Sequence, residues 1–303
     1  RLFRAVVCLG ATLAGLGGAL QLPKGGADLL MDLNIIAPAF VVVVVGGMGS
    51  ITGAFVASLL LGQLNALGVL LLPQLTLVLM FLVMAVVLVV RPYGLLGRPE
   101  TLAHPPAAAG SVVAGLGPRA PWPVILVLLA GLLALPWLAH DYVLVVVIEV
   151  IILALLAASL QAIMGPGGMV SFGHAAYFGA GAYAAALLVA KLGAPMAVAI
   201  AIAPLAALAT GLVFGWFCVR LAGVYLAMLS LAFAQIAWSV AQQWTAVTGG
   251  DDGILGIWPQ GWASSRIAFY HLVLALAALG VACLRHGLAS AFGWALRAGR
   301  DAP

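Results

Sequence analysis

Uncharged apolar runs follow one another along almost the whole sequence, and most approach the roughly 20 residues that an α-helix needs to cross a bilayer. Of the 303 residues, 65% are hydrophobic and 7% are charged, whereas a soluble domain carries roughly 25% charged residues. Inside a membrane every backbone polar group must be hydrogen-bonded within the protein, so spanning structures are helices or closed barrels. Runs of this length predict an all-α fold, a polytopic membrane helical bundle.

The expected crossings fall into two blocks. They cover about 5–22, 35–45, 51–72 and 75–90 in the first block, and about 122–139, 143–164, 171–190, 196–219, 224–243 and 267–284 in the second. Because the 35–45 run is short for a crossing, we expect a half-formed segment there. The stretch 99–121 is rich in Pro, Ala and Gly, which do not build a core. We therefore expect about ten segments, in domains 1–98 and 122–303, joined by a linker at 99–121.

The basic residues predict how the chain lies in the membrane. With ten crossings, nine of the twelve Lys and Arg residues fall on the side of the linker, and Lys24, Lys191 and Arg266 fall on the other. Cytoplasmic loops carry an excess of Lys and Arg, so the linker side is predicted to be cytoplasmic. The basic residues form no cluster interleaved with aromatic residues, so we expect no nucleic acid as a partner. The apolar runs instead predict contact with membrane lipid.

Two glycine-rich breaks interrupt the apolar runs, and they resemble each other. The pattern GGM-x-S-x-x-x-A occurs at 46–54 and again at 167–175. The chain is rich in Gly, Ala and apolar residues, so the match between the two breaks is either chance or the trace of an internal repeat. Backbone that leaves a helix at membrane depth is tolerated only where protein or a water-filled cavity covers it. Transporters often build the substrate site from such broken helices near the middle of the bilayer.

We therefore expect a substrate pathway along the two breaks. Its candidate residues are Gly47, Ser50, Gly168, Ser171, His174 and Tyr177. Two interpretations of His174 stay open, because a histidine in a broken helix either satisfies loosened backbone groups or lines the pathway.

Three acidic residues are candidates for special roles. Glu149 is the one acid deep inside an expected segment, where an ionisable group costs at least about 2.5 kcal/mol to insert. We expect it to face the bundle interior in a structural role; the alternatives are sensing substrate and reaching the membrane surface. Asp251 and Asp252 fall in a predicted external loop, TGGDDG. They form either a solvated turn or a gate that contacts an external partner.

Several kinds of chemistry lack the residues that they need. Around His174 no Cys, Asp or Glu stands at metal-ligand spacing, and Cys8, Cys218 and Cys283 are isolated in apolar runs. Ser171 lies outside any G-x-S-x-G motif, and no Asp is placed to orient His174. The sequence also lacks a G-x-x-x-x-G-K-[ST] loop. We therefore expect no metal, no catalytic residue and no cofactor in this chain, and an energy source outside it.

Longer stretches resemble a known family. MGPGGMVSFGHAAYFGAGAYAAALL at 164–188, RLAGVYLAM at 220–228 and WTAVTGGDDG at 244–253 resemble the amino-terminal half of the M-type permease subunit of ATP-binding-cassette (ABC) importers for branched-chain amino acids. VVVVVGGMGSITGAFVASLLLG at 41–62 and RPYGLLGR at 91–98 resemble the carboxy-terminal half of the companion H-type subunit.

The resemblance implies a non-enzymatic, multi-pass permease component in a bacterial plasma (inner) membrane. It also implies two cytoplasmic ABC ATPase subunits, which would bind the ATP, and a periplasmic or extracellular substrate-binding protein. The family's cytoplasmic coupling loops are expected to lie outside the two halves. The substrate would be a branched-chain or other hydrophobic amino acid, or urea or a short amide as in relatives of this family. An ion-coupled secondary transporter is the alternative, although it usually calls on several intramembrane ionisable groups.

Overall fold

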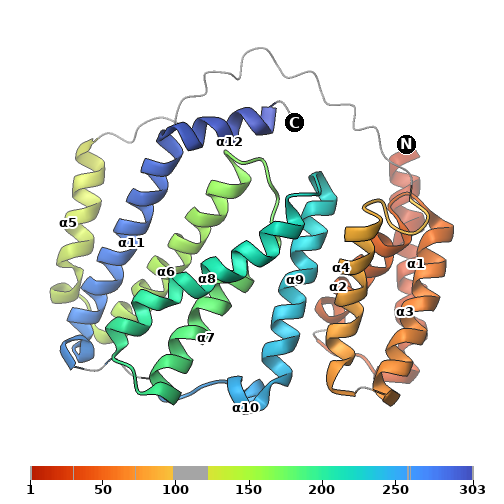
Figure 1. The fold of residues 1–303 in the computed structure, drawn as a ribbon, viewed down its shortest axis with the longest axis horizontal. Coiled ribbons are helices and arrows are strands. Elements are labelled where there is room, and N and C mark those ends of the chain that lie inside the picture. The colour runs from red at the N-terminus through yellow and green to blue at the C-terminus, as the bar shows by residue number, and fades with distance from the viewer. Residues whose placement is uncertain are drawn as a thin grey trace.

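The computed structural model describes residues 2–29, 31–71, 73–97, 122–257, 259 and 261–301. Within these ranges every regular element is a helix (Figure 1), which confirms the all-α prediction. The predicted linker at 99–121 lies outside the described residues.

In the described ranges, ten apolar helices match the predicted crossings. In the first block they are α1 (Leu2–Gly25), α2 (Met31–Gly46), α3 (Ile51–Leu71) and α4 (Thr76–Val90). In the second they are α5 (Trp122–Leu138), α6 (Asp141–Met164), α7 (His174–Leu192), α8 (Met196–Cys218), α9 (Gly223–Gln243) and α11 (Arg266–Ala289). Seven of these are long and apolar enough to cross a membrane, and α2, α4 and α5 contain shorter apolar helices. The prediction of a polytopic helical membrane bundle is confirmed.

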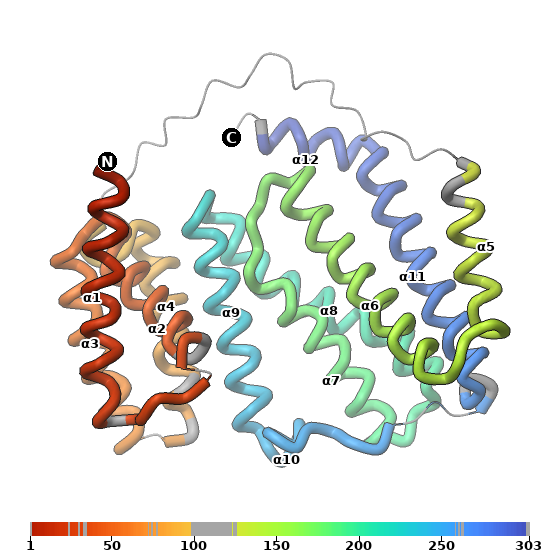
Figure 2. The backbone as a smooth tube through the Cα atoms, turned by 180° about the vertical axis from the view of Figure 1, so that it is seen from behind, coloured from red at the N-terminus to blue at the C-terminus, as the bar shows by residue number. Residues whose placement is uncertain are grey.

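Short elements complete the chain at the two ends of the bundle. They are the 3₁₀ turns η1 (Pro73–Leu75), η2 (Gly250–Asp252) and η3 (Gly261–Ser264), and the helices α10 (Thr245–Thr248) and α12 (Ala291–Asp301). Figures 1 and 2 show the start of α1, the start of α5 and α12 at one end of the bundle, with α10 at the other. We call the end with α12 inner, since the charges predict it to be cytoplasmic, and the end with α10 outer.

The short crossing of the first block is α2. It has 16 residues, a length of roughly 24 Å at 1.5 Å per residue, against a hydrocarbon thickness of about 30 Å. The helix begins at Met31, ahead of the predicted run, and continues through Pro38. The polar start of α2 therefore extends the run without bringing it to full crossing length.

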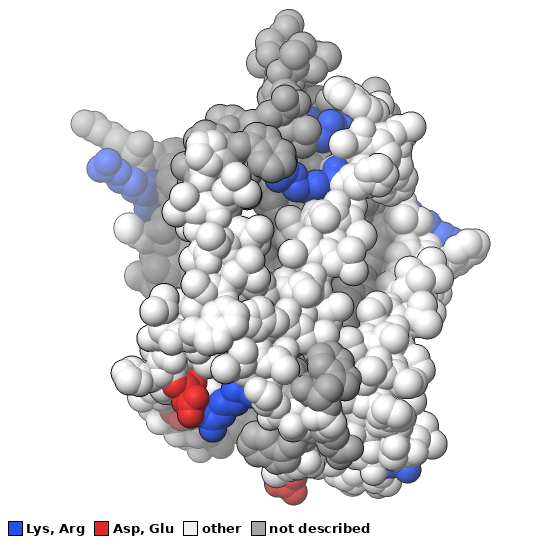
Figure 3. Space-filling view, turned by 90° about the vertical axis from the view of Figure 1, so that its left-hand side faces the viewer, with Lys and Arg blue, Asp and Glu red and all other residues white. Residues whose placement is uncertain are grey.

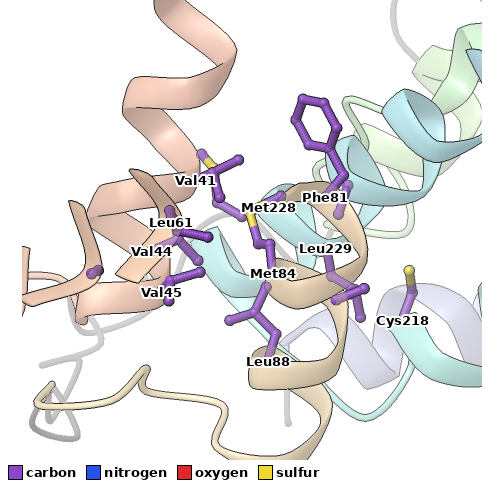
Figure 4. Close-up of a cluster of buried hydrophobic side chains, with 13 residues drawn as sticks. Val41, Val44, Val45, Leu61, Phe81, Met84, Leu88, Cys218, Met228 and Leu229 are labelled. Carbon is purple, nitrogen blue, oxygen red and sulfur yellow. The ribbon is translucent and has the colours of Figure 1, made fainter. Parts of the chain in front are cut away.

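One buried cluster joins the two blocks, as Figure 4 shows. The cluster runs from α2 through α4 to α9. Its central residues are Val41, Val44 and Val45 of α2, Met84 and Leu88 of α4, and Met228 and Leu229 of α9. The other members are Ala57, Leu61, Phe81, Ala85, Ala232 and Cys218. The cluster forms because α4 is apolar all round, so one face can pack on α2 and α3 while another packs on α9. We call the contact between α4 and α9 the seam.

A second cluster holds α5, α6 and α11 together. Leu144 and Ile151 of α6 pack with Tyr270 and Leu274 of α11. The hydroxyl of Tyr270 donates a hydrogen bond of 2.8 Å to the carbonyl of Leu132 in α5, so the one polar atom of this buried ring is satisfied.

Many large apolar side chains are exposed, as a lipid-facing surface requires. Figure 3 shows charged side chains gathered near the ends of one face, with a largely uncharged band between them. At the outer end Arg266 and Asp141 form an exposed ion pair that links the starts of α11 and α6.

Candidate functional site

The first break connects α2 to α3 at the inner end of the first block. Gly47 has φ of +101°, and a Cβ there would collide with the backbone of Gly97. The carbonyls of Val45 and Gly46 accept hydrogen bonds of 2.8 and 3.1 Å from the N–H groups of Leu95 and Leu96. The loop after α4 thus closes over this break and satisfies two carbonyls at the end of α2, which a helix end otherwise leaves unpaired.

Ser50 is the N-cap of α3. Its Oγ accepts a hydrogen bond of 3.0 Å from the backbone N–H of Gly53, which pairs one of the free donors of the first helical turn. Gly53 also lies so close to Gly46 that a Cβ on either residue would collide with the other's backbone. Glycines therefore set the sharp angle between α2 and α3.

The second break is longer and runs from the inner end into the bundle. At its start Gly168 has φ of +64°, and the side chain of Arg300 from α12 lies where a Cβ of Gly168 would be. Arg300 Nη1 donates a hydrogen bond of 3.1 Å to the carbonyl of Gly165. The cytoplasmic-side helix α12 and the second break are thus in direct contact.

At its end the second break packs against α9. The N–H of Phe172 donates a hydrogen bond of 3.0 Å to Ser230 Oγ, and the backbone of Gly173 lies against that of Ser230. Ser230 is seven residues from the first residue of α9, a distance of roughly 10 Å along the helix. The first break therefore lies at the inner rim, whereas the second reaches about a third of the way into the bundle.

His174 and Tyr177 lie together at the start of α7. His174 Nε2 is 2.7 Å from Ser159 Oγ on α6. Because the Ser159 hydroxyl donates to the carbonyl of Leu156 at 2.7 Å, the imidazole donates from Nε2, and Nδ1 is buried without a hydrogen-bond partner among the described residues. The Tyr177 ring meets the His174 ring edge-on, with centroids 5.7 Å apart.

An aromatic row continues from Tyr177 toward α9. The rings of Tyr177 and Phe214 have centroids 5.9 Å apart, and Phe214 of α8 stacks on Phe233 of α9 at 4.7 Å. The row links α7, α8 and α9 through apolar faces.

The two breaks lie on different sides of α9. The second break contacts Ser230, whereas the loop that closes the first reaches α9 through Tyr93, whose ring meets Tyr225 edge-on at 5.7 Å. At about 100° per residue, Tyr225 and Ser230 point about 140° apart. The structure thus brings His174 and Tyr177 together and gathers Gly168 and Ser171 in one break, with α9 between these residues and Gly47 and Ser50.

Glu149 is exposed on α6. It lies across the helix from Leu144 and Ile151, the residues that pack on α11. Within the described residues Glu149 therefore does not face the interior formed by this chain's own helices, and its structural role stays a prediction.

The loop with Asp251 and Asp252 is a fixed turn at the outer end of α9. Gln242 donates a hydrogen bond to the carboxylate of Asp251, and Thr248 Oγ1 donates to the carbonyl of Trp244 at 2.8 Å. Lys191, at the end of α7, donates to the carbonyl of Ala246 at 2.7 Å. Asp252 is exposed.

Sequence reasoning missed Ser159, Ser230, Tyr93 and Arg300. Serines inside apolar helices were the available signal for the first two, because a hydroxyl in hydrocarbon needs a partner. Nothing in the sequence indicated which backbone each would meet.

Comparisons with known proteins agree with this architecture. A family model described as "branched-chain amino acid transport system / permease component" matches residues 1–88 and 142–303. The chain is 34% identical over 100 residues to the high-affinity branched-chain amino acid transport system permease protein LivM of Escherichia coli K12, and 32% identical over 100 residues to LivM of Salmonella typhimurium LT2. Each alignment covers 33% of this chain and 24% of the relative, so the matched part spans about a quarter of these relatives' length.

No solved structure matches the chain. The family match alone covers well over half of it, in both blocks of helices. This multi-pass membrane chain belongs to the family of permease components of branched-chain amino acid transport systems.

Proposed function

We propose that this chain is the transmembrane permease part of an ABC importer that moves branched-chain or other hydrophobic amino acids into the cytoplasm. The observation that carries the proposal is the family match over both helical blocks, which contain the two broken crossings on either side of α9. The chain is not an enzyme in this proposal and binds no cofactor of its own.

The two blocks are two complementary permease halves. Residues 1–98 are the carboxy-terminal half of an H-type subunit, 122–303 the amino-terminal half of an M-type subunit, and 99–121 the cytoplasmic linker. The division of the family match into 1–88 and 142–303 supports this arrangement, as does the packing of the two blocks through α4 and α9.

The proposed pathway follows the second break and the aromatic row. His174 and Tyr177 lie where the break meets α7, and Phe214 and Phe233 extend an apolar surface that suits a hydrophobic side chain. Gly168 and Ser171 belong to the same break, while Gly47 and Ser50 shape the matching break on the other side of α9. Glu149 is kept as a structural acid of the assembled complex.

The proposed partners are those that the permease family implies. Two cytoplasmic ABC ATPases supply the energy at the inner end, where α12 contacts the second break. A periplasmic or extracellular binding protein delivers substrate at the outer end, where the Asp251–Asp252 turn is the candidate contact. The membrane is the bacterial plasma (inner) membrane.

Uptake into proteoliposomes tests the proposal. The preparation contains the gene product that carries this sequence, its ATPases and its binding protein, with labelled leucine outside. We expect uptake that requires ATP and that unlabelled isoleucine and valine compete. Competition by urea alone would move the substrate to short amides, and uptake driven by an ion gradient without ATP would replace the importer by a secondary transporter.

A further inference from the structure

One face of α9 carries an unexplained pair of polar side chains. The face toward the first block begins with Tyr225, which contacts Tyr93, and continues through Leu229 and Ala232 of the buried cluster and through Ile236. At three- and four-residue steps the next two positions on this face are Ser239 and Gln243. We call this row of six residues the seam face.

The polar side-chain atoms of Ser239 and Gln243 lack hydrogen-bond partners within the part of the chain that the structure describes. Ser239 is 0% exposed, and its Oγ is unpaired among the described residues, as are both the Oε1 and Nε2 atoms of Gln243. A buried polar atom left unpaired costs about 1–3 kcal/mol, and such atoms in a native structure call for an explanation. Two nearby side chains in this condition indicate that closing the outer part of the seam has a free-energy cost.

The inner part of the seam has the opposite character. Leu229 and Ala232 are 0% exposed and pack with Met84 and Leu88 of α4 (Figure 4). Closing this part buries apolar side chains against one another. Because Ser239 and Gln243 follow on the same face of α9, we expect separation of α4 from α9 to cost least at the outer end, where it would hydrate these two side chains.

The outer end of the seam also lies beside the loop at which a substrate would arrive. Gln242, the neighbour of Gln243, holds Asp251, and Thr248 fixes the turn against the end of α9. The polar pair thus stands at the mouth of the chain's outer face, close to the residues proposed to meet the binding protein.

We propose that substrate first binds at the outer part of the seam, on the side of α9 that faces the first block, and that Ser239 and Gln243 bind the charged head of a zwitterionic amino acid there. A hydroxyl and a carboxamide together offer donors for a carboxylate and acceptors for an ammonium group without a net charge. The apolar inner seam stays closed beneath the bound head. This inference rests on the proposed importer function and names the first substrate contact within it.

Cysteine substitutions along the seam face test whether substrate first binds there. In the assembled complex with the native cysteines replaced, Ala232, Ile236, Ser239 and Gln243 are each changed to Cys and treated with a membrane-impermeant thiol reagent from outside. We expect positions 239 and 243 to react at least about tenfold faster than 232, since a closed inner seam excludes the reagent. Leucine with its binding protein should slow both reactions. Leu208→Cys, at an exposed position on α8, should show no substrate effect. Equal rates at 232 and 239, or rates at 239 and 243 that substrate leaves unchanged, would overturn the proposal.

Transport kinetics test the polar contacts separately. Ser239→Ala and Gln243→Leu should each raise the concentration of loaded binding protein that gives half-maximal uptake by roughly 10- to 100-fold, the effect of losing one hydrogen bond to a charged group. The maximal rate should fall less, and Gln243→Asn should recover part of the loss. If ATP-driven uptake is normal in these variants, the head-group contact is refuted and the importer stands; if the unaltered complex shows no ATP-driven uptake, the importer itself is refuted.

Discussion

Removing the hydroxyl of Ser230 should loosen the second break. In the Ser230→Ala variant the N–H of Phe172 loses its acceptor at 3.0 Å, and Ser230 is 4% exposed, so water replaces the acceptor only if the break moves. A buried donor left unpaired costs about 1–3 kcal/mol. We therefore expect a lower melting temperature and a break that opens more often.

Hydrogen exchange measures the opening directly. A loss of about 1–3 kcal/mol corresponds to exchange roughly 5- to 150-fold faster in peptides that contain residues 165–173. Ser58→Ala is the matched control, because Ser58 is exposed on α3 and its Oγ donates to the carbonyl three residues before it, at 2.7 Å, as Ser230 Oγ does to the carbonyl of Ala227. If exchange in 165–173 rises no more in Ser230→Ala than in Ser58→Ala, the Phe172–Ser230 hydrogen bond does not hold the second break against α9, and the reasoning is refuted.

Three further substitutions probe the breaks. Gly47→Ala should prevent accumulation of folded protein in membranes, because its Cβ would collide with the backbone of Gly97. Gly62→Ala is the control and should be tolerated, because a Cβ there would lie in open space. Immunoblots of membrane fractions measure the amount of each variant. Gly168→Ala should cost about 1–2 kcal/mol from its positive φ and displace the Arg300 side chain, so protease cleavage within α12 should become faster. Ser50→Ala should remove the N-cap of α3 and lower stability by about 1 kcal/mol, seen as a lower melting temperature, while Ser50→Asp should retain most of it.

The crossings were predictable because hydrocarbon leaves the backbone few choices. Each apolar run of sufficient length had to become a helix, and the helices of the structure follow the predicted runs closely. The glycine signal also placed the two breaks correctly. The depth of each break in the membrane was not predictable, since it depends on tertiary packing. The first break lies at the inner rim, where Leu95 bonds to it, and the second lies deeper, where it bonds to Ser230 of α9.

The direction in which α6 faces could not be taken from the sequence. The helix is apolar nearly all round, so no periodicity identifies its inner side. The packing of Leu144 and Ile151 on α11 decides it, and Glu149 then points away. Similarly, no local pattern foretells that Arg300 would reach Gly165 or that His174 would meet Ser159, because these pairs join elements that only the tertiary fold brings together.

Helix α9 is held from two directions, and this restricts how it can move. Its Ser230 side is bonded to the second break, and its Tyr225 side touches the first block, about 140° around the axis. Turning α9 about its own axis would break both contacts at once. A tilt pivoting near these two residues keeps both, and it swings the outer end of the helix by the largest amount. The inner contacts of α9 therefore act as a pivot, and a tilt would displace the end that carries Gln243 farthest, together with the turn that Gln242 and Lys191 bind (Figure 1).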